Sequence, residues 1–175
     1  MDKLYIAADG DDMGSKIGAY IMSNNVEKAK ELSRLIHKGE KKVIDFATKT
    51  WQGNMILSGG DDMLVAVSPS KFDSAQLEQM RKLYHQTTGA TLTVGVGDSA
   101  AEAAKALAYG KNTGKNKVVV WDKKLQPKYD KMLKARVNDL RTKLRSQGGT
   151  TEAKREAIEL AKSIRYGRMG FYSSF

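Results

Sequence analysis

Short apolar stretches and longer amphipathic stretches alternate along the chain. Five stretches are short, rich in apolar or β-branched residues and bounded by glycine, proline or acidic residues, which is typical of strands. We predict these strands at residues 3–8, 55–57, 63–67, 91–97 and 116–121. Apolar residues three and four positions apart predict helices at about residues 13–23, 26–49, 73–85 and 99–111.

Several glycines lie where this pattern needs an explanation. Gly59 and Gly60 separate two predicted strands, and adjacent glycines are favoured in tight hairpin turns. Gly39 lies inside the second predicted helix, which we expect it to bend or split. Gly95 and Gly97 lie inside a predicted strand, where they indicate either a bulge or clearance for a ligand.

The order of the predicted elements is β-α-α-β-β-α-β-α-β. A central hairpin flanked by helix-connected strands is typical of a split βαβ, ferredoxin-like sheet. We therefore expect an α+β fold whose sheet contains antiparallel strands and carries its helices mainly on one face. Two more helices are predicted at about residues 125–145 and 151–166. This divides the chain into a body, residues 1–121, and a helical C-terminal extension, residues 122–175.

Composition narrows the classes of protein to consider. The 175 residues include no cysteine, which excludes a disulfide scaffold, thiolate catalysis and cysteine-based zinc sites. No apolar run approaches the ~20 residues of a membrane span. The first apolar stretch is also too short for a signal peptide. We therefore expect a soluble, cytoplasmic protein without a membrane partner.

Positive charge is concentrated in the C-terminal extension. The formal net charge of the chain is +10, and residues 122–175 hold 14 Lys and Arg against 6 Asp and Glu. Such an extension suits a polyphosphate, a nucleic acid or an acidic partner. It is equally typical of a solvated helical face, and the sequence leaves this choice open.

Two acidic clusters fall at the ends of predicted strands. Asp9, Asp11 and Asp12 follow the first strand, and Asp61 and Asp62 lie in the hairpin turn. In a split βαβ sheet the first strand lies beside the hairpin, so we expect Asp9 and Asp61 to face each other at one edge. Crowded carboxylates repel each other unless a cation lies between them, and hard oxygen ligands favour Mg²⁺ or Mn²⁺. Such a site suits phosphoryl or nucleotidyl transfer.

Glycines accompany both acidic clusters. Gly10 and Gly14 surround the start of a predicted helix, where backbone N–H groups donate hydrogen bonds to phosphate oxygens. Gly59 and Gly60 would let a nucleotide approach the hairpin backbone closely. Each cluster taken alone also fits an ordinary polar turn or helix cap. Their joint occurrence in this order of elements favours a nucleotide site.

Four motifs in sequence order resemble a known family. They are Asp9-Gly-Asp11 at a strand end, Gly59-Gly-Asp-Asp62 on a hairpin, the strand at 91–97 and the segment AKALAYGKNTGKN at 104–116. Together they resemble the palm domains of GGDEF diguanylate cyclases, and more closely the GGDD palm in the large subunit of type III CRISPR complexes. The resemblance covers residues 3–121. The short chain and the DGDDMG form are most similar to the minimal CRISPR polymerase family.

The resemblance implies a nucleotide cyclase, a nucleotidyltransferase that joins nucleoside triphosphates into a cyclic oligonucleotide and releases pyrophosphate without a nucleic acid template. It implies Asp61 and Asp62 as catalytic residues, which together with Asp9 and the Gly10 carbonyl hold Mg²⁺ or Mn²⁺. Asp62 either binds the second metal ion or helps to deprotonate the attacking ribose hydroxyl. The nucleotide-binding residues that the resemblance implies are Gly10, Asp11, Asp12, Met13, Gly14, Gly59, Gly60, Lys111 and Lys115.

One departure from the family pattern bears on the substrate. Diguanylate cyclases have a guanine-binding asparagine eight residues beyond the first metal-binding aspartate, and here that position is Ile17. This favours ATP, the substrate of the CRISPR relatives, with cyclic di-AMP as the product. The resemblance further implies a homodimer with facing active sites, and a receptor protein that binds the product as a signal in antiphage defence. The alternative is a catalytically silent palm that binds nucleotide, or nucleic acid through its basic extension.

Overall fold

The structure is a computed structural model that describes residues 2–59, 62–146, 154, 157 and 158. Its helices and strands follow the predicted order, and the palm-like α+β architecture is confirmed. The elements are β1 (Leu4–Gly10), α1 (Met13–Met22), α2 (Val26–Thr50), β2 (Asn54–Gly59), β3 (Asp62–Val67), α3 (Gln76–Thr88), β4 (Leu92–Gly97), α4 (Ala100–Asn112), β5 (Val118–Val120) and α5 (Gln126–Ser146). Among the described residues, no helix is both long and apolar enough to cross a membrane.

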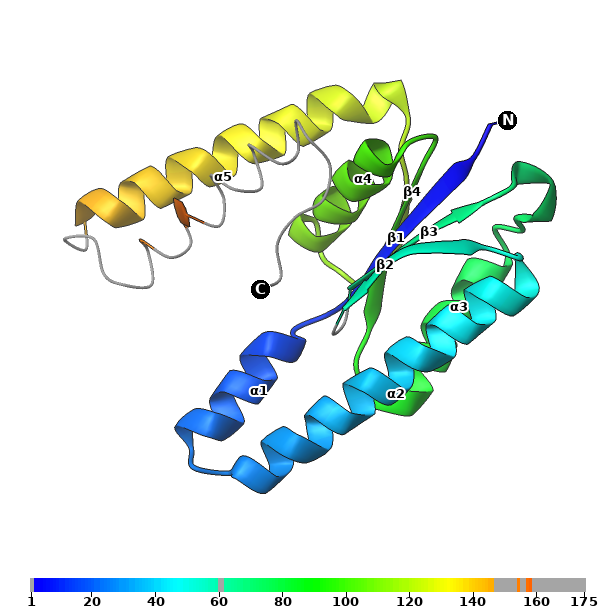
Figure 1. The fold of residues 1–175 in the computed structure, drawn as a ribbon. Helices are drawn as coiled ribbons and strands as arrows, with labels where there is room; N and C mark the ends of the chain where they lie inside the picture. The colour runs from blue at the N-terminus through cyan, green and yellow to red at the C-terminus, as the bar shows by residue number, and fades with distance from the viewer. Residues whose placement is uncertain (1, 60–61, 147–153, 155–156, 159–175) are drawn as a thin grey trace.

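Within the described residues, the strands form one sheet in the order β2-β3-β1-β4-β5. The central strand β1 pairs antiparallel with both β3 and β4, and β4 pairs parallel with β5. A parallel pair needs a crossover connection, and α4 supplies it here. The C-terminal end of β1 therefore lies midway along a row of strand ends, between the hairpin β2–β3 and the β4–α4 unit (Figure 1). We call this row of strand ends the acidic edge, which differs from the outer edge strand β2.

Helices cover both faces of the sheet. Ile6 and Ala8 of β1 point into the larger core, which packs against α2 and α3. Ala7, between them, points to the opposite face and contacts Ala103 of α4. This alternation is the two-residue period of a strand that is buried on both sides. The expectation of helices mainly on one face fits α2 and α3, whereas α4 covers the other face (Figure 1).

Gly95 and Gly97 allow α4 to pack closely on β4. A Cβ atom at Gly95 would lie 2.2 Å from the Ala103 carbonyl oxygen and 2.3 Å from the Leu107 nitrogen, and one at Gly97 would lie 2.6 Å from the Ala103 nitrogen. The register between β1 and β4 is regular throughout. The prediction of a bulge or of clearance for a ligand was therefore wrong, because these two glycines admit the backbone of a helix.

Gly39 has a similar role between α2 and α3. The prediction that it bends or splits the helix was wrong, because α2 runs unbroken from Val26 to Thr50. A Cβ atom at Gly39 would lie 2.4 Å from Cγ2 of Thr88 and 3.2 Å from the ring of Tyr84. The missing side chain therefore lets the end of α3 pack closely on α2.

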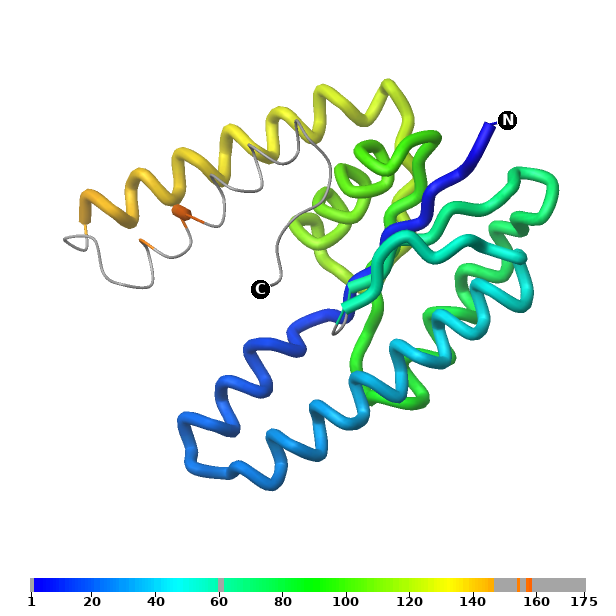
Figure 2. The backbone as a smooth tube through the Cα atoms, in the orientation of Figure 1, coloured from blue at the N-terminus to red at the C-terminus, as the bar shows by residue number. Residues whose placement is uncertain are grey.

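The first helix of the C-terminal extension is confirmed as α5. Its Tyr129 packs edge-on against Trp121 with ring centroids 5.5 Å apart, and Arg136 donates a hydrogen bond to Oδ1 of Asn112, the last residue of α4. Burial, together with the charge of Asp130, raises the pKa of Tyr129. The second predicted helix, residues 151–166, lies outside the continuously described residues. Figure 2 shows α5 on the side of the sheet that carries α4, and α1 leading away from the end of β1.

Candidate active site

The sheet register brings acidic residues of two strands together at one edge. Asp9 of β1 lies directly across from Asp62 of β3, and on its other side across from Thr93 of β4. Cross-strand neighbours of this kind have Cβ atoms about 5 Å apart. Asp62 is thus the described hairpin residue that pairs with Asp9. Asp61 and Gly60 lie outside the described residues.

Several hydrogen bonds hold the buried carboxylate of Asp11 in place. It is 3% exposed, and its carboxylate accepts bonds from the Thr91 hydroxyl at 2.7 Å, the Thr93 hydroxyl at 2.8 Å and the Asn116 backbone N–H at 3.0 Å. Burial alone would raise the pKa of Asp11, but the bonds from Thr91, Lys111 and Thr93 outweigh it, so the pKa lies below its ordinary value. Asp11 is therefore a buried carboxylate whose charged form is favoured by the groups that surround it.

Asp11 is one of the predicted nucleotide-binding residues, but its backbone N–H is already engaged. Its N–H donates to the Thr91 carbonyl at 2.8 Å and so already serves to connect the end of β1 to β4. Met13 contributes only backbone to the edge, because its side chain is buried in the core. The first hydrogen bond within α1 runs from the Lys16 N–H to the Asp12 carbonyl. The N–H groups of residues 13–15 precede it and have no carbonyl partner within the helix.

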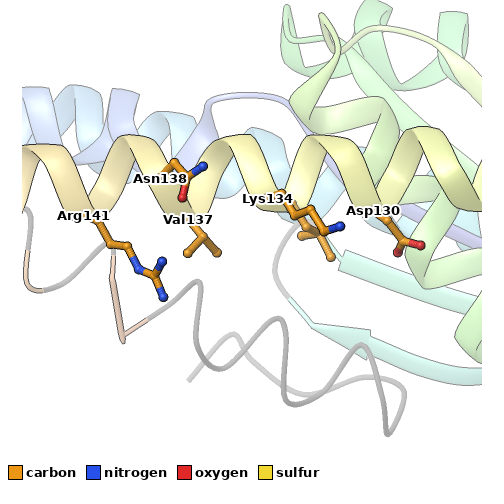
Figure 3. Close-up of a pocket in the computed structure, with 6 residues that line it drawn as sticks. Asp130, Lys134, Val137, Asn138 and Arg141 are labelled. Atoms are coloured by element: carbon orange, nitrogen blue, oxygen red, sulfur yellow. The ribbon is translucent and has the colours of Figure 1, made fainter.

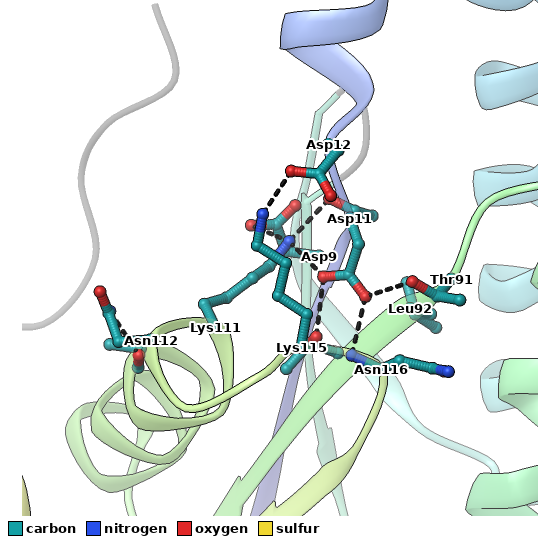
Figure 4. Close-up of polar contacts among 12 residues, drawn as sticks. Asp9, Asp11, Asp12, Thr91, Leu92, Lys111, Asn112, Lys115 and Asn116 are labelled. Carbon is teal, nitrogen blue, oxygen red and sulfur yellow. Dashed lines mark hydrogen bonds and ion pairs between the residues drawn. The ribbon is translucent and has the colours of Figure 1, made fainter.

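Lys111 joins the acidic residues from the last turn of α4. Its Nζ lies 3.0 Å from Asp9 Oδ2, 3.0 Å from Asp11 Oδ1 and 2.7 Å from the Gly10 carbonyl oxygen (Figure 4). Burial opposes its charge, but the charge of Asp9 and the contacts with Asp11 outweigh burial and raise the pKa of Lys111. The Lys111 ammonium thus contacts the Asp9 carboxylate and the Gly10 carbonyl, which are two of the predicted metal ligands.

Lys115 approaches the same edge from the turn after α4. Its Nζ forms an ion pair with Asp12, the residue that precedes α1 (Figure 4). Asp12 has a φ of 64°, in the left-handed region that residues other than glycine rarely adopt. The structure therefore brings both predicted lysines to the predicted acidic cluster, although they lie about a hundred positions away in sequence.

Two of the predicted glycines lie beside open space. A Cβ atom built at Gly14, in the first turn of α1, or at Gly59, at the end of β2, would have no heavy atom within 4 Å. Neither glycine is therefore required by packing among the described residues. Open space beside both is what the approach of a nucleotide to the backbone needs.

The donor set fits a hard divalent cation in its chemistry. The Asp9 carboxylate and Gly10 carbonyl already share a cationic group, the Lys111 ammonium, and Asp62 lies next to Asp9. All of these donors are oxygen atoms, as Mg²⁺ prefers. Over the described residues, no group of three or more His, Cys, Asp or Glu side chains forms a ready metal site.

Sequence reasoning missed several residues of the site. Thr91 and Thr93 stand two positions apart, so their side chains lie on the same face of the sheet as the side chain of Asp9. This two-residue period was a usable signal. Arg81 of α3 contacts Asn116 from the other side. Nothing in the local pattern of α3 distinguishes Arg81 from its neighbouring charged residues.

Described residues of α5 and of α3 line two hollows. The larger, of about 560 Å³, runs along α5 and is lined by Asp130, Leu133, Lys134, Val137, Asn138 and Arg141 (Figure 3). The smaller, of about 260 Å³, lies between α3 and the ends of β4 and α4, and is lined by Glu78, Arg81, Lys82, His85, Thr91 and Asn116. Neither is lined by Asp9, Asp62 or Lys111, so the chemistry predicted for these residues does not depend on either hollow.

Two solved structures are similar to this chain at low sequence identity, and one of them has a TM-score above 0.5. The Csm1–Csm4 cassette in complex with cA4 is 16% identical with a TM-score of 0.52, and the match covers 83% of this chain but only 29% of that chain. The active GGEEF domain of a diguanylate cyclase from Vibrio cholerae is 17% identical with a TM-score of 0.48, over 70% of this chain and 85% of that chain. No curated protein matches the chain.

A family model supplies the assignment that these distant structures do not. The model described as the minimal CRISPR polymerase domain matches residues 5–121. This range runs from the second residue of β1 through β5 and holds every described residue of the acidic cluster with its two lysines. Because the match spans more than half of the chain, the protein belongs to the minimal CRISPR polymerase domain family.

Proposed function

We propose that this protein is a cytoplasmic nucleotide cyclase that condenses ATP into a cyclic oligoadenylate, specifically cyclic di-AMP, and releases pyrophosphate. The observation that carries the proposal is the convergence of Asp9, Asp62, the Gly10 carbonyl and Lys111 beside the first turn of α1. Carboxylates, lysines and the N-terminus of a helix at one edge of a sheet suit a metal-bound triphosphate.

Mg²⁺, or Mn²⁺ in its place, is the proposed cofactor. Asp9, Asp62 and the Gly10 carbonyl would hold it, and the hairpin residue Asp61 is proposed as a further ligand. A divalent cation so placed stabilises the negative charge on the attacking and leaving oxygens of an in-line displacement. When it binds, Lys111 would be released from Asp9 and Gly10 to neutralise the triphosphate.

The first turn of α1 would bind the β- and γ-phosphates. The backbone N–H groups of Asp12, Met13 and Gly14 are the proposed donors, and the positive end of the helix dipole favours the same charge. Lys115 would exchange its ion pair with Asp12 for the γ-phosphate. Gly59 and Gly60 would admit the nucleotide next to the hairpin.

The proposed reaction needs no reactant other than ATP. A ribose hydroxyl of one ATP forms a bond to the α-phosphorus of another, the bond between that phosphorus and the bridging oxygen to the β-phosphate breaks, and pyrophosphate leaves. Asp62 is proposed either to bind metal or to accept the hydroxyl proton. A second transfer closes the ring.

Ile17 supports ATP over GTP. It lies one turn into α1, is partly buried and packs against the larger core, so its side chain offers no hydrogen bond to a guanine edge. A site that lacks this hydrogen bond loses the means to prefer guanine over adenine. ATP is the proposed substrate for this reason.

Two active sites must meet for the reaction to occur. One site of this size holds one triphosphate, whereas the product joins two, so the proposed active form is a homodimer with facing sites. The cyclic product is proposed to act as a signal in antiphage defence by binding a separate receptor protein. No nucleic acid template enters the reaction.

The proposal is tested by incubating the protein separately with ATP, GTP, CTP and UTP in the presence of Mg²⁺ and analysing the products by mass spectrometry. We expect a cyclic adenylate and pyrophosphate from ATP, and neither from Asp9→Asn or Asp62→Asn. Asp98→Asn is the matched control, because Asp98 follows the opposite end of β4 and is exposed. Absence of any product, with single-stranded RNA retained at moderate salt, would instead support a silent, nucleic acid-binding palm.

A further inference from the structure

The turn that carries Lys115 has an unusual backbone. Gly114, Lys115 and Asn116 follow one another with φ values of 118°, 55° and 46°. Only the first is a glycine, and residues with a Cβ atom disfavour the left-handed region. Two consecutive residues of this kind persist only where surrounding groups hold them in place.

Within the turn itself, the hydrogen bonds account for only part of this restraint. The N–H groups of Thr113 and Lys115 both donate to the Gly110 carbonyl, at 3.2 Å and 3.0 Å. These bonds connect the turn to the end of α4, but they leave the conformation of Asn116 to contacts from elsewhere. The two sides of Asn116 supply those contacts.

Arg81 of α3 holds Asn116 from one side. Its Nη2 donates to the Asn116 carbonyl oxygen at 2.5 Å and also to Oδ1 of the same residue. Its Nε donates to the Leu92 carbonyl at 3.1 Å, and Nη1 forms an ion pair with Glu78. The side chain is only 14% exposed, so the guanidinium is fixed at several points and cannot reorient without losing bonds.

Asp11 holds Asn116 from the other side. Its Oδ2 accepts the Asn116 backbone N–H at 3.0 Å, while its Oδ1 lies 3.0 Å from Nζ of Lys111. Asn116 is therefore fixed between the guanidinium of α3 and the buried carboxylate at the end of β1. Because the Asp11 carboxylate contacts both Asn116 and Lys111, it connects the turn to the other lysine of the site.

We infer that Arg81 is a positioning residue that holds the strained turn 113–116, so that Lys115, together with Lys111, points toward the acidic edge where the triphosphate binds. The part that concerns the triphosphate rests on the proposed function. The part that concerns the turn does not. The hydrogen bonds of Arg81 join it to Leu92, Glu78 and Asn116, so it acts on the turn through Asn116.

The first experiment measures backbone hydrogen exchange of the turn without nucleotide. Arg81→Met removes the donors but keeps an unbranched side chain, Arg81→Lys keeps the charge without the planar fork, and Lys82→Met is the matched control. Lys82 lines the same hollow from the next position on α3 and is exposed. We expect the Asn116 amide to exchange about tenfold faster in Arg81→Met, less so in Arg81→Lys and unchanged in Lys82→Met. Unchanged exchange at residues 113–117 in Arg81→Met would overturn the inference.

The second experiment measures the dissociation constant of α,β-methylene-ATP with Mg²⁺ in a double-mutant cycle. We expect Arg81→Met and Lys115→Met each to weaken binding about tenfold, and the double variant to bind no more weakly than Lys115→Met alone. Multiplying penalties would show that Arg81 does not act through Lys115, and would overturn the inference. If the unaltered protein binds no nucleotide, the proposed function fails, and the exchange experiment alone decides whether Arg81 holds the turn.

Discussion

The two sides of the candidate site are built differently. On the β4–α4 side, Asp11 is buried and accepts hydrogen bonds from Thr91 and Thr93, and α4 packs on β4 without a gap. On the hairpin side, β2 is an edge strand that is exposed along most of its length, including Ile56 and Leu57. Its pairing with β3 also shifts register between Met55 and Leu57.

The difference separates the residues that build the site from those expected to perform chemistry. Buried groups on the β4–α4 side fix the backbone that carries the lysines before any ligand arrives, so only the lysine side chains have to change partners when a ligand binds. The hairpin contributes Asp62 from a strand next to an open edge. We therefore expect substitutions on the first side to change stability most, and those on the hairpin to change activity most.

Asp62→Asn should produce the largest effect. We expect cyclic adenylate formation to fall by about 10³-fold, because an amide is a poor metal ligand and a poor proton acceptor. Stability should be unchanged or slightly higher, because the substitution removes a like charge directly opposite Asp9. Initial rates and urea unfolding measure the two quantities. More than a tenth of the activity remaining would contradict the proposed role of Asp62.

Gly95→Ala and Gly59→Ala form a matched pair for stability. The new methyl group at Gly95 would collide with the backbone of α4, which cannot move aside cheaply, so we expect a loss of about 3 kcal/mol. The methyl group at Gly59 meets open space, and the change should stay within about 0.5 kcal/mol. Chemical denaturation compares the two variants. Equal losses would mean that the hairpin is packed as tightly as the β4–α4 side.

Asp11→Asn should destabilise the protein by about 2 kcal/mol at neutral pH, because it weakens charge-assisted bonds and leaves Lys111 with a poorer partner. The lowered pKa of Asp11 sets the pH dependence. The charged form is favoured in the folded state, so its stabilisation is complete above the ordinary aspartate pKa of about 4 and is lost as the pH falls through the lower folded-state pKa. The difference between the two proteins should therefore be constant from about pH 5 to neutrality and shrink below about pH 4. A difference that grows on acidification would contradict this.

Lys111→Met should give the smallest effect, in opposite directions with and without nucleotide. Without nucleotide, removing the ammonium from Asp9 and the Gly10 carbonyl should strengthen Mn²⁺ binding by roughly fivefold, as measured by electron paramagnetic resonance. With α,β-methylene-ATP present, the same variant should bind nucleotide more weakly, because a triphosphate partner is lost. Weaker Mn²⁺ binding without nucleotide would show that Lys111 and the metal do not share ligands.

Much of the fold follows from local pattern. The apolar stretches and their periods predict the order of the elements, and the paired glycines predict the hairpin between β2 and β3, because these signals depend on near neighbours in the chain. The meeting of β1 with the hairpin follows from that order, which is how Asp9 could be placed beside the GGDD turn. Register is a finer matter, and it is the pairing of β1 with β3 that puts Asp62 across from Asp9.

The roles of individual glycines and of Asp11 do not follow from the pattern. Gly39, Gly95 and Gly97 each suggested a backbone irregularity, yet each is a point where a helix or a side chain from a distant segment comes close. Asp9 and Asp11 are two aspartates of the same acidic cluster, and the local sequence does not distinguish them. Asp11 is buried and hydrogen-bonded, whereas Asp9 lies at the acidic edge. Only contacts across the sheet distinguish them.

Propensity, periodicity and capping act over a few residues, so the kinds of elements, their order, and the carboxylates and lysines at strand and helix ends follow from the amino-acid sequence. Tertiary structure alone decided which carboxylate is buried, which oxygens Lys111 contacts, and that Arg81 holds the turn of Lys115. These outcomes depend on distances between residues up to a hundred positions apart. Burial and charge pairing across such separations arise only once the sheet and helices have packed.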